Sequence, residues 1–105
     1  MNNKKFASTL RKGFHMTFEN GLTISVQWGA GNYCDNRDSG DFTCRTDASS
    51  DTAEIAVMCG REFLDVGPFV PKHCYHDGIV CGYMSPEDVL YTMNKVKKFA
   101  PKANQ

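Results

Sequence analysis

The chain has 105 residues, of which 41% are hydrophobic and 23% are charged, and its 12 basic and 12 acidic residues cancel. This length and composition are typical of one globular domain with a single modest core. No apolar run reaches the roughly 18 residues of a membrane span, and the polar N-terminus lacks the apolar stretch of a signal peptide. We therefore expect a cytoplasmic protein with no membrane contact.

The charges are unevenly distributed along the chain. Residues 1–34 carry four basic and one acidic residue, residues 35–71 carry three and eight, and residues 72–105 carry five and three. Binding of duplex nucleic acid requires a clustered excess of Lys and Arg, so we expect no duplex nucleic acid as a partner. The lysines near the C-terminus suit the last turn of a helix, where cations interact favourably with the helix dipole.

The N-terminal segment, residues 1–12, is polar and basic. Its only apolar anchors are Phe6 and Leu10. The pattern fits either a short helix docked on a sheet or a loose arm, and it does not distinguish between them.

Next, residues 14–18 and 22–28 alternate apolar and polar side chains, which is typical of a half-buried hairpin. A three-residue loop pairs Phe18 with Leu22 and continues this register down both strands, so that all large side chains share one face. We therefore expect a type I turn that ends with Gly21 in the left-handed conformation.

Three further strands are predicted, over residues 52–59, 63–66 and 78–84. Before the first of these strands, residues 34–50 form a long polar loop of the kind that is either functional or disordered. Pro68 and Pro71 end the second strand and keep the segment after it extended.

A C-terminal helix is predicted over residues 85–100. Ser85 is a suitable N-cap, Pro86 suits the first helical position, and Asp88 lies where a capping-box acid belongs. The apolar stripe expected to face the core comprises Val89, Leu90, Met93, Val96 and Ala100. The order of elements predicts an α+β domain, in which the helix packs on one face of a small antiparallel sheet.

Five cysteines are many for this length, but their odd number in a cytoplasmic chain argues against disulfides. We expect Cys59 and Cys81 to be small core residues. The residue types at His73, Cys74, His76 and Cys81 would suit zinc, yet their spacing lacks a second ligand pair. We therefore predict no metal and no other cofactor.

Enzymatic activity is not expected either, because the sequence has none of the motifs of serine hydrolases, phosphate-binding loops or zinc proteases. The loop after the hairpin instead has the composition of a rim that binds a ligand or a partner. It offers aromatic faces, amides and two arginines, and the candidate ligand-binding residues are Trp28, Asn32, Tyr33, Asn36, Arg37 and Arg45. Alternatively, the aromatic residues pack the end of the sheet and the arginines balance nearby aspartates.

Three blocks of sequence resemble small bacteriophage proteins. They are FENGLTISVQW with GNYC (residues 18–28 and 31–34), TAEIAV (52–57) and GYMSPEDV (82–89). The resemblance implies a protein of the host cytoplasm that counteracts host defence by binding rather than by chemistry. It implies either sequestration of a nucleotide-derived signalling molecule or masking of a host defence protein. For the second function, the acidic excess of the middle segment predicts that residues 35–65 form the binding surface. Homo-oligomer formation is left open.

Overall fold

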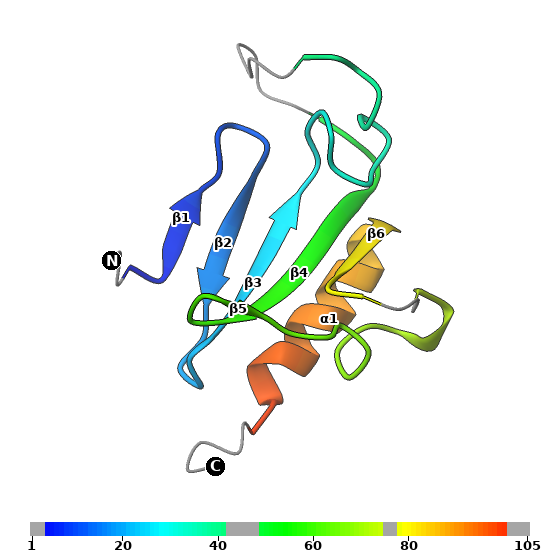
Figure 1. Ribbon diagram of the computed structural model, residues 1–105. Coiled ribbons are helices and arrows are strands. Elements are labelled where there is room, and N and C mark those ends of the chain that lie inside the picture. The colour runs from blue at the N-terminus through cyan, green and yellow to red at the C-terminus, as the bar shows by residue number, and fades with distance from the viewer. Residues whose placement is uncertain (1–3, 42–48, 75–77, 101–105) are drawn as a thin grey trace.

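The computed structural model describes residues 4–41, 49–74 and 78–100. In chain order its elements are β1 (Phe6–Ser8), β2 (Gly13–Thr17), β3 (Leu22–Gln27), β4 (Ala53–Cys59), β5 (Glu62–Phe63), the 3-10 helix η1 (Lys72–Cys74), β6 (Val80–Met84) and α1 (Pro86–Lys98). The strands form one antiparallel sheet in the order β1-β2-β3-β4-β5, with β6 also paired to β4. Helix α1 packs on one face of this sheet, where it contacts β3, β4 and β6 (Figure 1). The predicted α+β class is confirmed.

The hairpin of β2 and β3 has the predicted register. Met16 pairs with Ile24, and the Phe18 amide donates to the Leu22 carbonyl at 2.9 Å. The Gly21 amide donates to the Phe18 carbonyl at 2.9 Å, and Gly21 has a φ of 88°, as a type I turn with a left-handed third loop residue requires.

The N-terminal segment is neither a docked helix nor, over its described part, a loose arm. Strand β1 pairs with β2 at the edge of the sheet. Phe6 and Leu10 are 69% and 79% exposed, so the expectation that they anchor the segment is wrong. Hydrogen bonds between the backbones of β1 and β2, which do not depend on the side-chain type, hold this strand in place.

The segment after β4 differs from its prediction. The expected strand over 63–66 is reduced to β5, and the expected extended segment is a turn in which the amides of Phe69 and Val70 both donate to the Val66 carbonyl. These three residues are buried, and the Phe69 ring packs edge-on against Phe99 with 5.0 Å between centroids. Burial of this apolar cluster outweighs the extended preference beside the prolines.

Helix α1 starts as predicted, with the Ser85 hydroxyl accepting from the Asp88 amide at 3.1 Å. Its buried face differs, however. Leu90 is 59% exposed, whereas Thr92 is fully buried and donates its hydroxyl proton to the Asp88 carbonyl at 2.9 Å. Ala100 is also exposed. Within the described residues, no helix is both long and apolar enough to cross a membrane.

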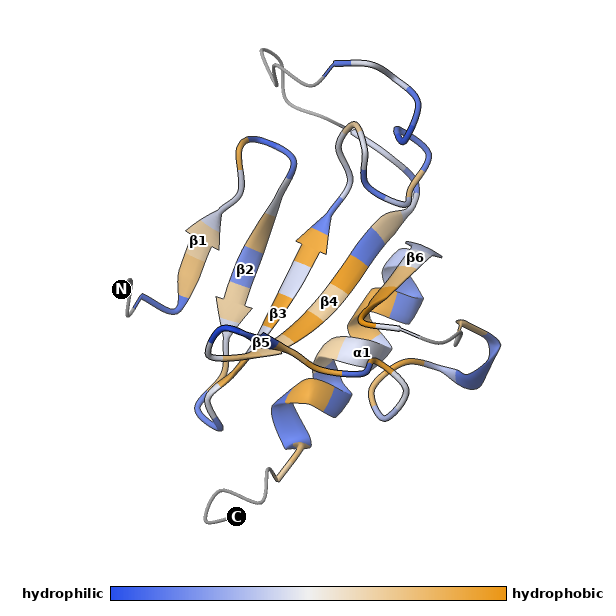
Figure 2. Cartoon of the chain, viewed as in Figure 1, coloured by the Kyte–Doolittle hydropathy of each residue, from blue (hydrophilic) through white to orange (hydrophobic). Residues whose placement is uncertain are grey.

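The core lies between α1 and the sheet. Its fully buried members include Leu22, Ile24, Ile55, Val57, Phe69 and Met84. Figure 2 shows this apolar character along β3 and β4, whereas the loop that follows β3 is largely hydrophilic. Among the cysteines, Cys81 is buried as expected, but Cys59 is exposed and Cys34 takes a core position instead, because Cys59 lies at the end of β4.

Candidate ligand-binding site

The two asparagines of the predicted rim hold the loop together. The Asn32 side chain accepts from the Gly29 amide and donates to the Glu54 carboxylate, both at 2.9 Å. The Asn36 amide donates to the carbonyls of Trp28 at 2.8 Å and Ser49 at 2.7 Å. Both amide side chains are therefore engaged in hydrogen bonds that hold the loop, and these bonds position the residues between them.

Tyr33 and Arg37 form the accessible part of this loop. The Arg37 guanidinium lies 4.8 Å from the centre of the Tyr33 ring, and both residues are exposed. Arg37 also lies 3.9 Å from the exposed carboxylate of Asp38, a weak surface ion pair. The Tyr83 amide donates to the Tyr33 carbonyl at 2.9 Å, which fixes the loop against β6. Arg45, the sixth predicted rim residue, lies outside the described residues.

Trp28 packs against the hydrophobic core. Its ring packs edge-on against Phe14 and lines a cavity of about 320 Å³ between the sheet and α1. The other lining residues include Met84, Val89 and Leu90, so this helix-side cavity is mainly apolar. None of the described residues that line it is basic. The structure thus divides the predicted rim between two places.

A second cavity of about 320 Å³ lies on the sheet face opposite α1. Its polar lining consists of His15, Ser25, Gln27 and Glu54, from three adjacent strands. The Gln27 amide donates to the Ser25 hydroxyl at 3.0 Å, and Asn32 reaches the Glu54 carboxylate from the loop. Burial lowers the pKa of His15, which favours the neutral imidazole. We call this the open-face cavity.

The sequence pattern contained a signal for the open-face cavity. Its polar residues occupy the alternate positions of the hairpin and β4, opposite to the core-facing ones. On an uncovered face such residues are ordinary solvent-exposed positions. The hollow in which they converge is also lined by Phe63 from β5, which short-range patterning does not place there.

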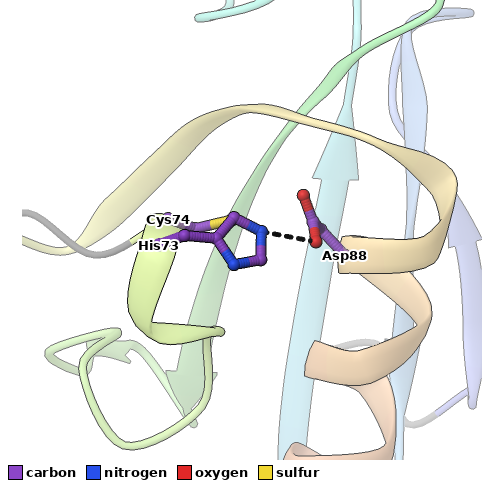
Figure 3. A group of neighbouring side chains, drawn as sticks. All are labelled: His73, Cys74 and Asp88. Atoms are coloured by element: carbon purple, nitrogen blue, oxygen red, sulfur yellow. Dashed lines mark hydrogen bonds and ion pairs between the residues drawn. The ribbon is translucent and has the colours of Figure 1, made fainter.

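A separate cluster joins η1 to the start of α1. His73 Nε2 lies 3.0 Å from Asp88 Oδ1, and the Cys74 thiol lies beside the same carboxylate (Figure 3). Burial and the hydrogen bond to Asp88 raise the pKa of Cys74 to about 12. Burial opposes ionisation of Asp88, but hydrogen bonds from Cys74, Ser85 and His73 outweigh it and lower the Asp88 pKa.

These pKa shifts disfavour a cysteine nucleophile, which requires a thiolate near neutral pH. His76, which the sequence grouped with Cys74, lies outside the described residues. Cys81 is close, but its thiol donates to the Cys74 carbonyl at 2.9 Å. Asp88 was treated in the sequence only as a helix cap, so its place in this cluster was missed.

The fold and these sites define a small α+β domain with a cavity on each face of its sheet. Comparisons with protein-family models, with curated proteins and with solved structures found no match.

Proposed function

We propose that this chain is a non-enzymatic binding protein that sequesters a nucleotide-type signalling molecule in the open-face cavity. The resemblance to bacteriophage proteins makes interference with host defence the proposed biological role. The observation that carries the proposal is the convergence of Ser25, Gln27 and Glu54 in one hollow of about 320 Å³, beside a loop that presents Arg37.

The chemistry of the lining supports a nucleobase. Gln27 offers an amide donor and acceptor, Ser25 a hydroxyl and Glu54 a carboxylate acceptor, which match the polar edge of a base. Phe63 lines the same cavity with a ring that is 51% exposed, and an exposed aromatic face stacks on any base. The volume is at the lower end of small-molecule sites, so it suits a base rather than a whole dinucleotide.

The phosphate of such a ligand would be bound by Arg37. A guanidinium binds phosphate through two parallel hydrogen bonds and stays charged. Among the described residues, Arg37 has one ion pair, the 3.9 Å contact with the exposed Asp38, which water and a phosphate easily replace. The bond between Asn32 and Glu54 connects the loop that carries Arg37 to the cavity lining.

The helix-side cavity is a poorer site for this ligand. Its lining is mainly apolar, and its charged member is Asp51. A phosphate there would be repelled and left without a donor of positive charge. We therefore assign Trp28 to packing and to the wall of this cavity, and not to the proposed nucleotide site.

A second candidate is a protein–protein inhibitor that masks a basic groove of a host defence protein. The supporting observation is that Asp35, Asp38, Asp41, Asp51, Glu62 and Asp65 are all exposed. Such a field accelerates association with a basic partner and sets specificity. Capture of a host partner in stoichiometric amount, with loss of capture at high salt, would favour this function over nucleotide sequestration.

The test is a thermal-shift screen against cyclic di- and trinucleotides and ADP-ribose derivatives. A ligand at one hundred times its dissociation constant adds about 2.7 kcal/mol, which raises the melting temperature by about 10–20 °C in a domain of this size. Arg37→Ala should abolish the shift, whereas Arg61→Ala, a matched exposed arginine, should preserve it. No shift with any nucleotide at millimolar concentration would contradict the proposal.

A further inference from the structure

Three potential metal ligands of different chemistry meet where η1 contacts the first turn of α1. The ligand atoms of His73, Cys74 and Asp88 all lie within 4.8 Å of one another. His73 and Cys74 are adjacent in η1, and Asp88 follows 14 residues after Cys74, on another element. Figure 3 shows the imidazole and the carboxylate directed toward each other. We propose that these three side chains form a zinc-binding site.

The geometry is close to that of a tetrahedral zinc site. Zinc bonds of about 2.0–2.3 Å place neighbouring ligand atoms roughly 3.3–3.8 Å apart. His73 Nε2 and Asp88 Oδ1 are 3.0 Å apart, and the widest separation in the group is below 4.8 Å. Movements of about 1 Å in these side-chain atoms would bring all the separations into this range.

The donor set favours zinc over magnesium and calcium. An imidazole, a carboxylate and a cysteine thiol are the nitrogen, oxygen and sulfur ligands that zinc accepts. The bound ion itself displaces the thiol proton of Cys74, so the raised pKa of the metal-free thiol lowers the affinity without preventing coordination. Magnesium and calcium prefer oxygen alone, so the cysteine excludes them. Three protein ligands leave the fourth position open to water or to a further ligand, as in non-structural zinc sites.

The backbone behind Cys74 and Asp88 is fixed by other contacts. The Cys74 amide donates to the Pro71 carbonyl, and the Cys81 thiol donates to the Cys74 carbonyl, both at 2.9 Å. The Asp88 amide is held by the Ser85 cap. These bonds position the ligands without using their metal-binding atoms, which is the role of supporting contacts around a metal.

The site is also accessible from solvent. The His73 side chain is 71% exposed and that of Asp88 is 20% exposed, so an ion reaches the carboxylate past the imidazole. The sequence disfavoured zinc because Cys74, His76 and Cys81 lack the spacing of paired ligands. The fold instead supplies Asp88 from a distant helix turn, a contact that short-range spacing does not reveal.

The experiment is a zinc titration of the untagged full chain by calorimetry after chelator treatment. We expect one zinc per chain with wild-type protein. His73→Gln, Cys74→Ser and Asp88→Asn should each weaken binding by about a hundredfold or more, because loss of supporting contacts alone costs 10–100-fold. The matched controls are Cys59→Ser and Glu87→Gln, an exposed thiol and the neighbouring exposed acid, and they should bind within about twofold of wild type.

Cobalt(II) serves as a second probe because its spectrum reports the ligand atoms. Wild-type protein and Cys59→Ser should show a thiolate-to-cobalt charge-transfer band, and Cys74→Ser should lack it while retaining its fold by circular dichroism. Absence of zinc binding by wild type, or retention of full affinity in all three ligand variants, would overturn the proposal. A cobalt band that survives in Cys74→Ser would overturn it as well.

Discussion

Replacement of Asn20 by alanine should destabilise the domain through the loss of one side chain that joins the hairpin turn to the end of α1. Its amide nitrogen donates to the carbonyls of Val96 at 2.7 Å and Phe99 at 2.9 Å, and its oxygen accepts from the Leu22 amide at 3.0 Å. A third carbonyl, that of Lys97, lies at 3.3 Å. The Asn20 side chain thus supplies donors to carbonyl groups at the C-terminal end of α1, where helical N–H partners are missing.

The magnitude follows from these bonds. The amide has two protons, so we count two donated bonds and one accepted bond, each with a net contribution of about 0.5–1.5 kcal/mol. Water replaces the partner at the exposed carbonyl of Phe99, which places the total near the lower end, at about 2 kcal/mol. Asn20→Asp should cost at least as much, because it adds a negative charge beside the helix C-terminus.

Urea denaturation checks this prediction. A loss of about 2 kcal/mol lowers the midpoint by about 1 M at unchanged slope, for a slope near 2 kcal/mol per molar. Glu19→Ala, in the same turn and exposed, is the control and should remain within about 0.5 kcal/mol of wild type. An Asn20→Ala protein whose free energy of unfolding lies within about 0.5 kcal/mol of wild type would contradict this prediction. A smaller loss in Asn20→Asp than in Asn20→Ala would contradict it as well.

Three further predictions concern the core, the loop and the open face. Val57 is fully buried, so Val57→Ala should lower the free energy of unfolding by about 2–4 kcal/mol through cavity formation. Leu90 is exposed, so Leu90→Ala should lower it by about 0.5 kcal/mol or less. Urea denaturation measures both changes. Gly82→Ala should lower the free energy of unfolding by about 1–3 kcal/mol in the same assay, because the new Cβ would overlap the Tyr33 Cβ and lie 2.8 Å from the Tyr33 carbonyl oxygen. No measurable change would show that the loop moves away from the added methyl group at little cost. Burial lowers the pKa of His15 in the folded state, so its contribution to the stability of the fold is present above pH 6.5 and is lost as the pH falls below that value. The free energy of unfolding, measured from about pH 7.5 to 5.5, should therefore decrease less in His15→Gln than in wild type. Equal decreases would show that His15 is not the cause.

The hairpin was predictable because its information is local. Alternation fixes which face is buried, and the loop length then fixes the register, so Met16 meets Ile24 without reference to the rest of the chain. Gly21 adds a backbone requirement that few other residues satisfy. The cap at Ser85 was predictable for the same reason.

The buried face of α1 was only partly predicted. At 3.6 residues per turn, Thr92 lies about 60° from Val89 and Leu90 lies about 100° from it. Hydrophobicity alone selected Leu90, but the geometry of the stripe through Val89 and Val96 places Thr92 inward. Its hydroxyl is satisfied within the helix, so burial does not leave it unpaired.

The candidate sites could not be located from the sequence because each depends on contacts between distant segments. Asn32 meets Glu54 only once β3 and β4 are paired and the loop has closed over them. Asp88 meets His73 only once η1 packs beside α1. Residue types indicated a polar rim and a group of metal-ligand residues, but which members converge was set by the fold.

A nitrogen-15 NMR titration shows directly whether the open-face cavity holds the ligand. The labelled chain is titrated with the cyclic di- and trinucleotides and with the ADP-ribose derivatives. The account predicts that an interacting nucleotide shifts the amide signals of Ser25, Gln27 and Glu54, and those of the loop around Arg37, while those of Val89 and Leu90 beside the helix-side cavity stay unchanged. Shifts confined to Val89 and Leu90, or no shift with any of these nucleotides, would contradict it.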